Sequence, residues 1–155
     1  MKVELKKLKI NKELSEETTA FTCEIWASED RLKSETEFVC YARNYGHGGP
    51  NDYRTDGERS KELLAKLTTY AKRFCEEDSS DSMALDSFID NHISMQKNLK
   101  KGIVYIDKNT FELFKLTFKV KKGEALSDTL KTKLNARMLS LTYEGHHVIN
   151  SKRFT

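Results

Sequence analysis

The chain has 155 residues, of which 37% are hydrophobic and 33% charged, and its formal net charge is +3. Eight Phe, six Tyr and one Trp supply large apolar side chains that disordered chains lack, and a chain of this length can bury roughly two-thirds of its unfolded surface. These values exclude a disordered linker and favour a single folded domain over residues 1–155. No run approaches the ~20 apolar residues of a membrane span, and no apolar signal-peptide core follows Met1, so we expect a cytoplasmic protein.

Three strands are expected before the first helix. Residues 2–10 alternate imperfectly, which predicts an edge strand with a bulge near Lys6 and Lys7. Residues 19–27 and 37–44 alternate cleanly between apolar and polar side chains, so we expect them to pair. The inward-facing residues are expected to be Phe21, Cys23, Ile25, Phe38, Cys40 and Ala42. The odd number of cysteines, Cys23, Cys40 and Cys75, indicates reduced thiols rather than a disulfide framework.

Two helices are expected next. Thr55 and Glu58 have capping-box spacing, which predicts a helix start at this point. Apolar residues with a period of 3.6 then follow in two stripes, Leu63, Leu64, Leu67, Tyr70, Ala71 and Phe74, and after an acidic break Leu85, Phe88, Ile89, His92, Ile93, Gln96 and Leu99. His92 lies on an apolar face, where a structural role is favoured over a ligand role.

The last third predicts two strands, a third helix and one uncertain element. Residues 103–106 are continuously apolar, as in a strand with both faces covered, and a turn follows at residues 107–110. In residues 113–121 the inward-facing side chains are expected to be Phe114, Leu116, Phe118 and Val120. A helix is expected over roughly 124–141 and a final strand over 147–150. The alternative is a hairpin that pairs Leu139, Leu141 and Tyr143 with Val148. Together these elements predict an α+β fold with an antiparallel sheet of about five or six strands.

The most unusual segment is residues 44–53, which holds three of the seven glycines and the only proline. Glycine reaches positive φ at little steric cost, so consecutive N–H groups here can form a concave nest for an anion. The segment lacks the Lys-Ser/Thr ending of a P-loop and the strand-Gly-x-Gly-x-x-Gly-helix register of a dinucleotide site. Two interpretations stay open, a structural loop that turns the chain out of the sheet and a binding loop.

Aromatic side chains next to this segment indicate a contact surface. Trp26 and Tyr41 fall on the strand face opposite Phe21 and Cys23, so either helices cover that face or it is exposed and binds a partner. The binding residues expected are Trp26, Tyr41, Asn44, Tyr45, Gly46, His47, Gly48, Gly49, Asn51, Asp52 and Tyr53. A metal cluster of His47, Asp52, His146 and His147 has no supporting spacing. A hydrolase that uses His47 with Asp52, or His146 with His147, is a third hypothesis, which only the geometry of the folded chain can test. We expect no catalytic residues, metal or cofactor.

Basic residues gather in the C-terminal third. Residues 101–155 carry 11 Lys and Arg against 5 Asp and Glu, whereas residues 1–100 carry 16 against 19. This charge favours an anionic partner and supports an alternative hypothesis of nucleotide or nucleic-acid binding, with phosphate held by the glycine-rich segment. The basic residues for that alternative are Lys115, Lys119, Lys121, Lys122, Lys131 and Arg137. No aromatic platform for stacking bases accompanies them, and exposed lysines also protect sheet edges from aggregation.

Three short motifs give a resemblance. Residues 44–53 read N-x-G-x-G-G-x-N-x-Y, Leu85–Asp90 read Leu-Asp-x-Phe-Ile-Asp, and Lys101–Tyr105 read Lys-Gly-Ile-Val-Tyr. The chain resembles a group of small phage and prophage proteins in these motifs, over about two-thirds of its length. The resemblance implies a phage-encoded, non-enzymatic protein that binds and inhibits or redirects a host protein, such as a component of a defence system.

Overall fold

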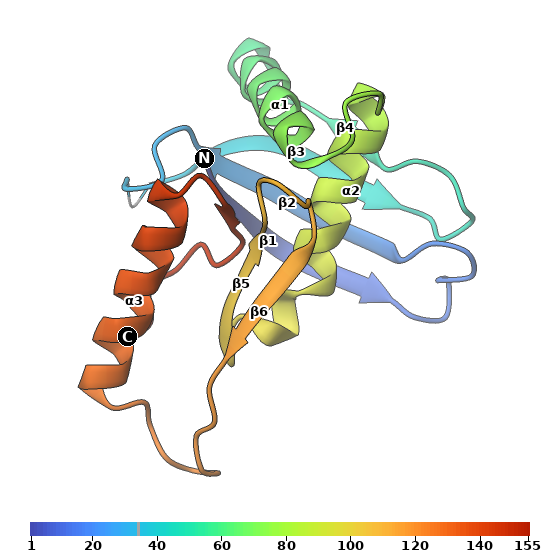
Figure 1. Ribbon diagram of the computed structural model, residues 1–155. Coiled ribbons are helices and arrows are strands. Elements are labelled where there is room, and N and C mark those ends of the chain that lie inside the picture. The colour runs from blue at the N-terminus through green and yellow to red at the C-terminus, as the bar shows by residue number, and fades with distance from the viewer. Residues whose placement is uncertain (34) are drawn as a thin grey trace. The chain divides into compact units, whose positions relative to one another are not determined.

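The computed structural model describes residues 1–33 and 35–155, which divide into two compact units, Met1–Asp90 and Asn91–Thr155. Within these residues, three α-helices and two antiparallel sheets of four and three strands confirm the α+β class (Figure 1). The strands therefore form two sheets rather than one sheet of five or six strands. Whether the chain behaves as one folding domain stays a prediction.

The first unit contains a four-stranded sheet. Its strands β1 (Lys2–Asn11), β2 (Ala20–Ser28), β3 (Glu37–Asn44) and β4 (Asp52–Arg54) lie in that order, and each neighbour is antiparallel. The predicted bulge in β1 is confirmed, because the register with β2 shifts between Lys6 and Lys9 and Lys7 has a positive φ of 53°. Strand β4 was not predicted: the end of the glycine-rich segment pairs with β3 as a short edge strand.

A second bulge, in β3, changes which aromatic residues share a face. Ile25 lies opposite Cys40, but the next residue, Trp26, lies opposite Phe38. Val39 is therefore the extra residue, and Val39 and Cys40 are both buried. The prediction that Phe38 faces inward with Cys40 is wrong, because the bulge moves Phe38 to the face that carries Trp26.

Helix α1 (Glu58–Ala71) covers the face of this sheet opposite Trp26 and Phe38. It contacts β3 and buries Leu63, Leu67 and Ala71, as its apolar stripe predicted. The capping-box prediction at Thr55 is wrong: the hydroxyl of Ser60 accepts the N–H groups of Asp56 and Gly57, so the helix begins at Glu58. A 3-10 turn (Lys72–Phe74) follows, and then α2 (Asp81–Ser94).

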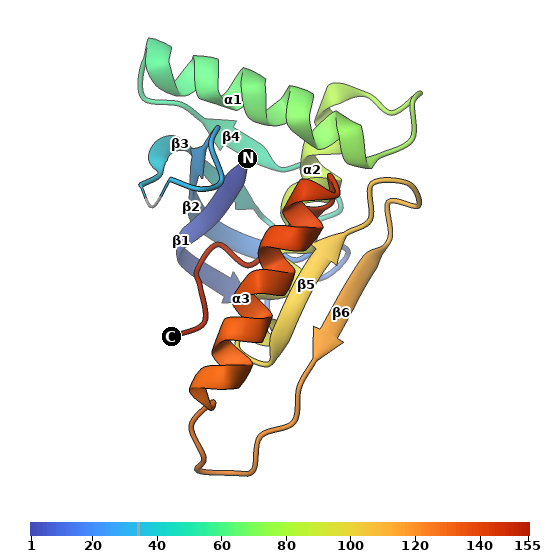
Figure 2. The same ribbon diagram turned by 60° about the vertical axis from the view of Figure 1, so that its left-hand side comes forward.

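The second unit is built on a three-stranded sheet in the order β6-β5-β7. Its strands β5 and β6 lie side by side in Figure 2. After the end of α2 and a 3-10 turn (Gln96–Asn98) come β5 (Gly102–Ile106), β6 (Leu113–Thr117), α3 (Asp128–Tyr143) and β7 (His147–Val148). The hydroxyl of Ser127 caps α3 by accepting the N–H of Leu130. One core cluster joins helix and sheet, made of Ile103, Leu134, Met138, Leu141 and Val148. The alternative hairpin over residues 139–148 is therefore wrong.

Strand β6 is shorter and more exposed than predicted. Its regular part ends at Thr117, and the side chains expected to face inward, Phe114, Leu116 and Val120, are 39%, 38% and 37% exposed. The physical reason is position, because β6 is an edge strand and has a neighbour on one side only. Alternation alone cannot distinguish an edge strand from a central one.

Two further findings concern membrane spans and cysteines. No helix in the described ranges combines the length and the apolar content that a bilayer crossing requires. The cysteines Cys23, Cys40 and Cys75 are free thiols. Burial raises the pKa of both Cys23 and Cys40 to about 12, so these two thiols are unreactive near neutral pH.

Candidate functional site

The glycine-rich segment 44–53 is braced from inside by Asn44, which is 8% exposed. Its side-chain oxygen accepts the hydroxyl of Thr18 (2.7 Å) and the N–H of Gly46 (2.8 Å). Its side-chain nitrogen donates to the Gly49 carbonyl (3.0 Å) and to Oδ1 of Asn51 (2.9 Å). One amide group thus joins both ends of the segment to the connection between β1 and β2.

Two glycines adopt backbone shapes that other residues resist. Gly46 has φ +88°, its carbonyl accepts the N–H groups of Glu16 and Glu17, and a Cβ built on it would lie 1.9 Å from the Leu14 carbonyl oxygen. Gly48 has φ +84°, and its N–H donates to the Thr18 hydroxyl. These contacts support the structural interpretation of the segment.

The end of the segment is tied to α2 by a polar network. Asn51 donates its backbone N–H to Oδ2 of Asp86 and its side-chain nitrogen to Asp90, and the Tyr53 hydroxyl donates to Oδ1 of Asp86 at 2.8 Å. Burial, with Asp86 as a further cause, raises the pKa of Tyr53, so the phenol stays protonated. Asn51 and Tyr53, both predicted as binding residues, lie in this internal network.

What the segment presents to solvent is therefore a small set of side chains. Tyr45 is 60% exposed, and Gly48, Gly49 and Pro50 are exposed as well. His47 is exposed and lies 3.5 Å from a Glu16 carboxylate oxygen. Because the N–H groups of Gly46 and Gly48 already donate to oxygens of this chain, an anion nest at this place would have to break both bonds.

The face of the four-stranded sheet opposite α1 is the strongest candidate site, and we call it the open face. Directly opposed residues of antiparallel strands share a face. On this basis Trp26 lies with Phe38, Glu24 with Tyr41, and Tyr41 with Arg54, while Arg43 lies with Thr22 and Asp52. Of the two alternatives that the sequence left open, exposure holds for Tyr41, which is 52% exposed.

A row of aromatic rings runs across the open face. The centroids of Trp26 and Phe38 are 5.8 Å apart in an edge-to-face arrangement, and those of Phe38 and Tyr41 are 4.8 Å apart. The ammonium group of Lys6 lies 3.8 Å from the Trp26 ring centroid, and the indole N–H donates to Glu24 at 2.9 Å. These contacts hold Trp26 in one orientation and occupy part of its ring surface.

A hollow of about 440 Å³ lies beside this row. The charged side chains that line it are Lys7, Lys9, Glu24, Arg43, Asp52 and Arg54. Lys7 pairs with Glu24 at 2.8 Å, and Asp52 pairs with Arg43 at 3.0 Å and with Arg54 at 3.5 Å. Four cations thus face two carboxylates, so the hollow carries an excess of positive charge.

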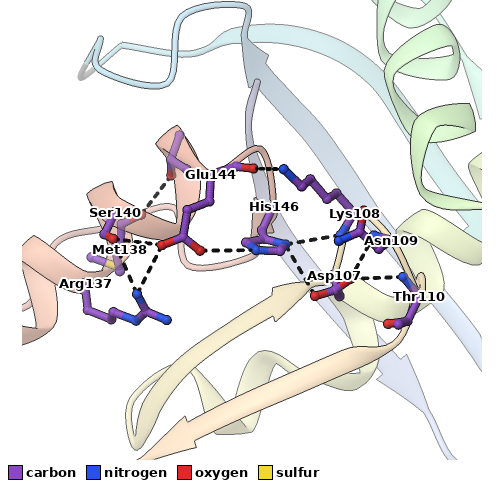
Figure 3. A network of polar contacts seen from close by, with 10 residues as sticks. Asp107, Lys108, Asn109, Thr110, Arg137, Met138, Ser140, Glu144 and His146 are labelled. Atoms are coloured by element: carbon purple, nitrogen blue, oxygen red, sulfur yellow. Dashed lines mark hydrogen bonds and ion pairs between the residues drawn. The ribbon is translucent and has the colours of Figure 1, made fainter.

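A second polar network, in the second unit, centres on His146 (Figure 3). Its Nδ1 accepts the backbone N–H of Lys108 at 3.2 Å and lies 3.6 Å from an Asp107 carboxylate oxygen, and its Nε2 lies 3.4 Å from a Glu144 carboxylate oxygen. The Ser140 hydroxyl donates to Glu144 and not to the histidine. A hydrolytic triad needs the hydroxyl on the imidazole, so this arrangement does not support the His146 version of the hydrolase hypothesis.

His147 is buried and lies against His92, with 2.9 Å between their Nε2 atoms. This bond agrees with the structural role predicted for His92. Within residues 1–33 and 35–155, no three His, Cys, Asp or Glu side chains converge in a way that could hold a metal ion. The expectations of no metal, no cofactor and no catalysis stay predictions.

The basic residues of the alternative hypothesis are dispersed along one part of the chain. Lys115 lies on β6, Lys119, Lys121 and Lys122 lie in the connection to α3, and Lys131 and Arg137 lie on α3. Arg137 pairs with Glu144 at 3.4 Å, and Lys131 lies 3.7 Å from Asp128. The unit Asn91–Thr155 has 13 Lys and Arg against 5 Asp and Glu, a net charge of +8.

Sequence reasoning missed several residues of the open face. Arg43 shares the parity of Tyr41 in a predicted strand, so alternation could have placed it there. Phe38 could not be placed, because its face depends on the bulge at Val39. Arg54 could not be placed either, because no strand was expected at residues 52–54.

Comparisons of the chain with protein-family models, with curated proteins and with solved structures found no match.

Proposed function

We propose that this chain is a non-enzymatic binding protein that docks on another protein through the open face. The observation that carries this proposal is the row of Trp26, Phe38 and Tyr41 beside a hollow that Arg43 and Arg54 help to line. Tyr, Trp and Arg are the residues that dominate binding energy at protein interfaces. The rings are held by a sheet and by each other, so little side-chain entropy remains to be lost on docking.

The charge of the hollow defines the partner surface. Four cations and two carboxylates line it, so an acidic surface fits better than a basic one. Single-stranded nucleic acid fits less well, because stacking needs free ring faces and Lys6 lies over Trp26. The braced segment 44–53 adds Tyr45 at the margin, where the Arg43 guanidinium lies 5.0 Å from the Tyr45 ring centroid.

The resemblance to phage and prophage proteins defines the kind of partner. In this proposal the chain is phage-encoded, acts in the host cytoplasm, and inhibits or redirects a host protein such as a defence-system component. The open face supplies a means for this, because occupying a surface of the partner needs no chemistry. The resemblance stays a prediction.

A double substitution tests the proposal. Tyr41→Ala with Tyr45→Ala removes two rings that are 52% and 60% exposed, so the fold should persist. A single control, Tyr143→Ala, removes a ring that is 76% exposed on α3. We expect proteins captured from a bacterial host lysate by the parent chain and by the control to be lost with the double variant. The purified partner should bind the double variant about 100-fold more weakly, as expected for two hot-spot residues.

Two outcomes would refute the proposal. One is equal binding of the purified partner to the double variant and to the parent chain. The other is capture that depends on Tyr143 and not on Tyr41 and Tyr45. Circular dichroism of all three proteins shows whether a loss of binding reflects a loss of structure.

Nucleic-acid binding is a second candidate, supported by the net charge of +8 on Asn91–Thr155. Neutralising phosphates releases counterions, so the affinity for an oligonucleotide should fall steeply with salt. Replacing Lys119, Lys121 and Lys122 by Ala should reduce the slope of log affinity against log salt by roughly two to three. An unchanged slope would reject these lysines as phosphate contacts.

A further inference from the structure

The outer edge of β6 carries backbone groups that the sheet leaves unused. At the two ends of the β5–β6 ladder, Phe118 donates its N–H to Lys101 and Asp107 donates its N–H to Glu112. Hydrogen-bonded pairs alternate along an antiparallel ladder, so Phe114 and Leu116 direct their N–H and C=O groups toward β5. Leu113, Lys115 and Thr117 therefore direct theirs away from the sheet.

The opposite side of β5 is closed by this chain. Beyond the short β7, the backbone N–H of Ile149 donates to the Val104 carbonyl at 2.8 Å. The side chain of Asn150 accepts the Val104 N–H at 2.8 Å and donates to the carbonyls of Leu99 and Gly102. The sheet of the second unit is thus completed on the β7 side and ends in β6 on the other.

The side chains of β6 differ between its two faces. Phe114 and Leu116 share one face and are 39% and 38% exposed, and the Phe114 ring stacks on Tyr105 with centroids 5.5 Å apart. Lys115 points to the other face and is exposed. Beyond the strand, the chain continues with Lys119, Lys121 and Lys122. An added strand would therefore meet an apolar row on one face and positive charge on the other.

We infer that β6 is a strand-addition site for an extended acidic segment of a partner protein, in which apolar and acidic residues alternate. Backbone hydrogen bonds to Leu113, Lys115 and Thr117 would supply affinity, and the side-chain alternation would supply specificity. Apolar residues would cover Phe114 and Leu116, and acidic residues would lie beside Lys115.

Charge complementarity selects this occupant over a second copy of the chain. Antiparallel pairing of two β6 strands about their centre would place Lys115 opposite Lys115, and like charges directly opposed are destabilising. Edge lysines discourage self-association for this reason. The same lysines attract a strand of opposite charge.

A short acetylated peptide of alternating glutamate and valine is the probe. Its binding is measured by fluorescence anisotropy, against a peptide of the same length and sequence except that proline replaces the central residue. We expect the alternating peptide to bind at least about tenfold more tightly than the proline peptide. Hydrogen exchange should show new protection at the N–H groups of Lys115 and Thr117.

Three variants separate the backbone from the charge. Lys115→Pro removes an outward N–H without removing a bond to β5, and Lys115→Ala removes the same charge but keeps the N–H. We expect Lys115→Pro to bind the peptide about tenfold more weakly than Lys115→Ala. Lys115→Glu keeps the N–H. It should bind the acidic peptide more weakly than the parent chain does, and bind a peptide of alternating lysine and valine more tightly.

Several results would overturn the inference. These are equal binding of the two peptides, equal affinities of Lys115→Pro and Lys115→Ala, or no change of preference in Lys115→Glu. Tighter binding of an oligonucleotide at the same edge, or a dimer lost in Lys115→Pro, would assign the edge to nucleic acid or to a second copy. The site uses no residue of the open face, so its failure leaves the proposed function standing.

Discussion

The glycine-rich segment 44–53 and the edge strand β6 place backbone groups at the surface in opposite ways. In the first, the N–H groups of Gly46 and Gly48 and the carbonyls of Gly46 and Gly49 all bond within the chain. In β6, Leu113, Lys115 and Thr117 direct their backbone groups away from the sheet. The glycines of residues 44–53 therefore serve a loop whose backbone groups bond within the chain. Strand β6, whose composition is ordinary, instead carries outward backbone groups that a partner strand could pair with.

The largest expected loss of stability tests whether the contacts of residues 44–53 brace that segment. Gly46→Ala places a Cβ 1.9 Å from the Leu14 carbonyl oxygen at a φ of +88°, and that oxygen belongs to the backbone rather than to the end of a flexible side chain. We expect the free energy of unfolding, measured by urea denaturation, to fall by about 3 kcal/mol. Gly49→Ala is the control, because no heavy atom lies within 4 Å of its Cβ position, and it should stay within about 0.5 kcal/mol. Equal effects would show that the segment is not braced.

The next effect compares the two sides of the second sheet. Asn150 is 4% exposed and accepts the Val104 N–H, so Asn150→Ala leaves that buried donor without this acceptor. We expect a loss of about 2 kcal/mol in urea denaturation. Lys115→Ala on the opposite side should change stability by less than about 0.5 kcal/mol. A large effect of Lys115→Ala would mean that the β6 edge contributes to the fold itself.

A smaller effect separates the inner and outer tyrosines of the segment. The Tyr53 hydroxyl donates to Asp86 and accepts from Asn51, so Tyr53→Phe should lower the free energy of unfolding by about 1 kcal/mol. Tyr45 is 60% exposed, and Tyr45→Phe should have no measurable effect on unfolding. The reverse order would place Tyr45 in the internal network in place of Tyr53.

The smallest effect concerns pH and the turn that leads into β6. The backbone N–H groups of Thr110 and Asn109, with His146 nearby, lower the pKa of Asp107. A carboxyl with a lowered folded-state pKa stabilises the fold above its unfolded pKa of about 3.9, and this contribution is lost as the pH falls through the folded value. Asp107→Asn should therefore lower the melting temperature near neutral pH, with a difference from the parent chain that shrinks in acid. Asp78→Asn, at an exposed position, is the control.

Local pattern predicted most elements because the physical signal was local. The alternation in residues 37–44 predicted the extent of β3 but not its bulge at Val39, and the stripe with Leu63 and Leu67 matches the buried face of α1. The parity change in residues 2–10 predicted the bulge in β1, since a bulge is the way a strand keeps one face buried. The cap of α1 was assigned to Thr55, whereas the Ser60 hydroxyl accepts the N–H groups of Asp56 and Gly57 and the helix begins at Glu58.

The candidate site was predicted in part. Trp26 and Tyr41 lie on the open face, and Tyr45 and His47 are exposed. Asn44, Asn51 and Tyr53 instead hold the segment together, because each has a hydrogen-bonding partner far away in the chain. A sequence cannot show which polar groups are already satisfied by distant partners.

The sequence by itself determined the α+β class, the antiparallel pairing of β2 with β3 and the need for glycine in residues 44–53. Each of these follows from side-chain periodicity or backbone sterics within a few neighbouring residues. The tertiary structure decided the division into two sheets, the position of Phe38 beside Trp26, and the edge position of β6. These depend on strand order and register, which are set by contacts between residues far apart in the chain.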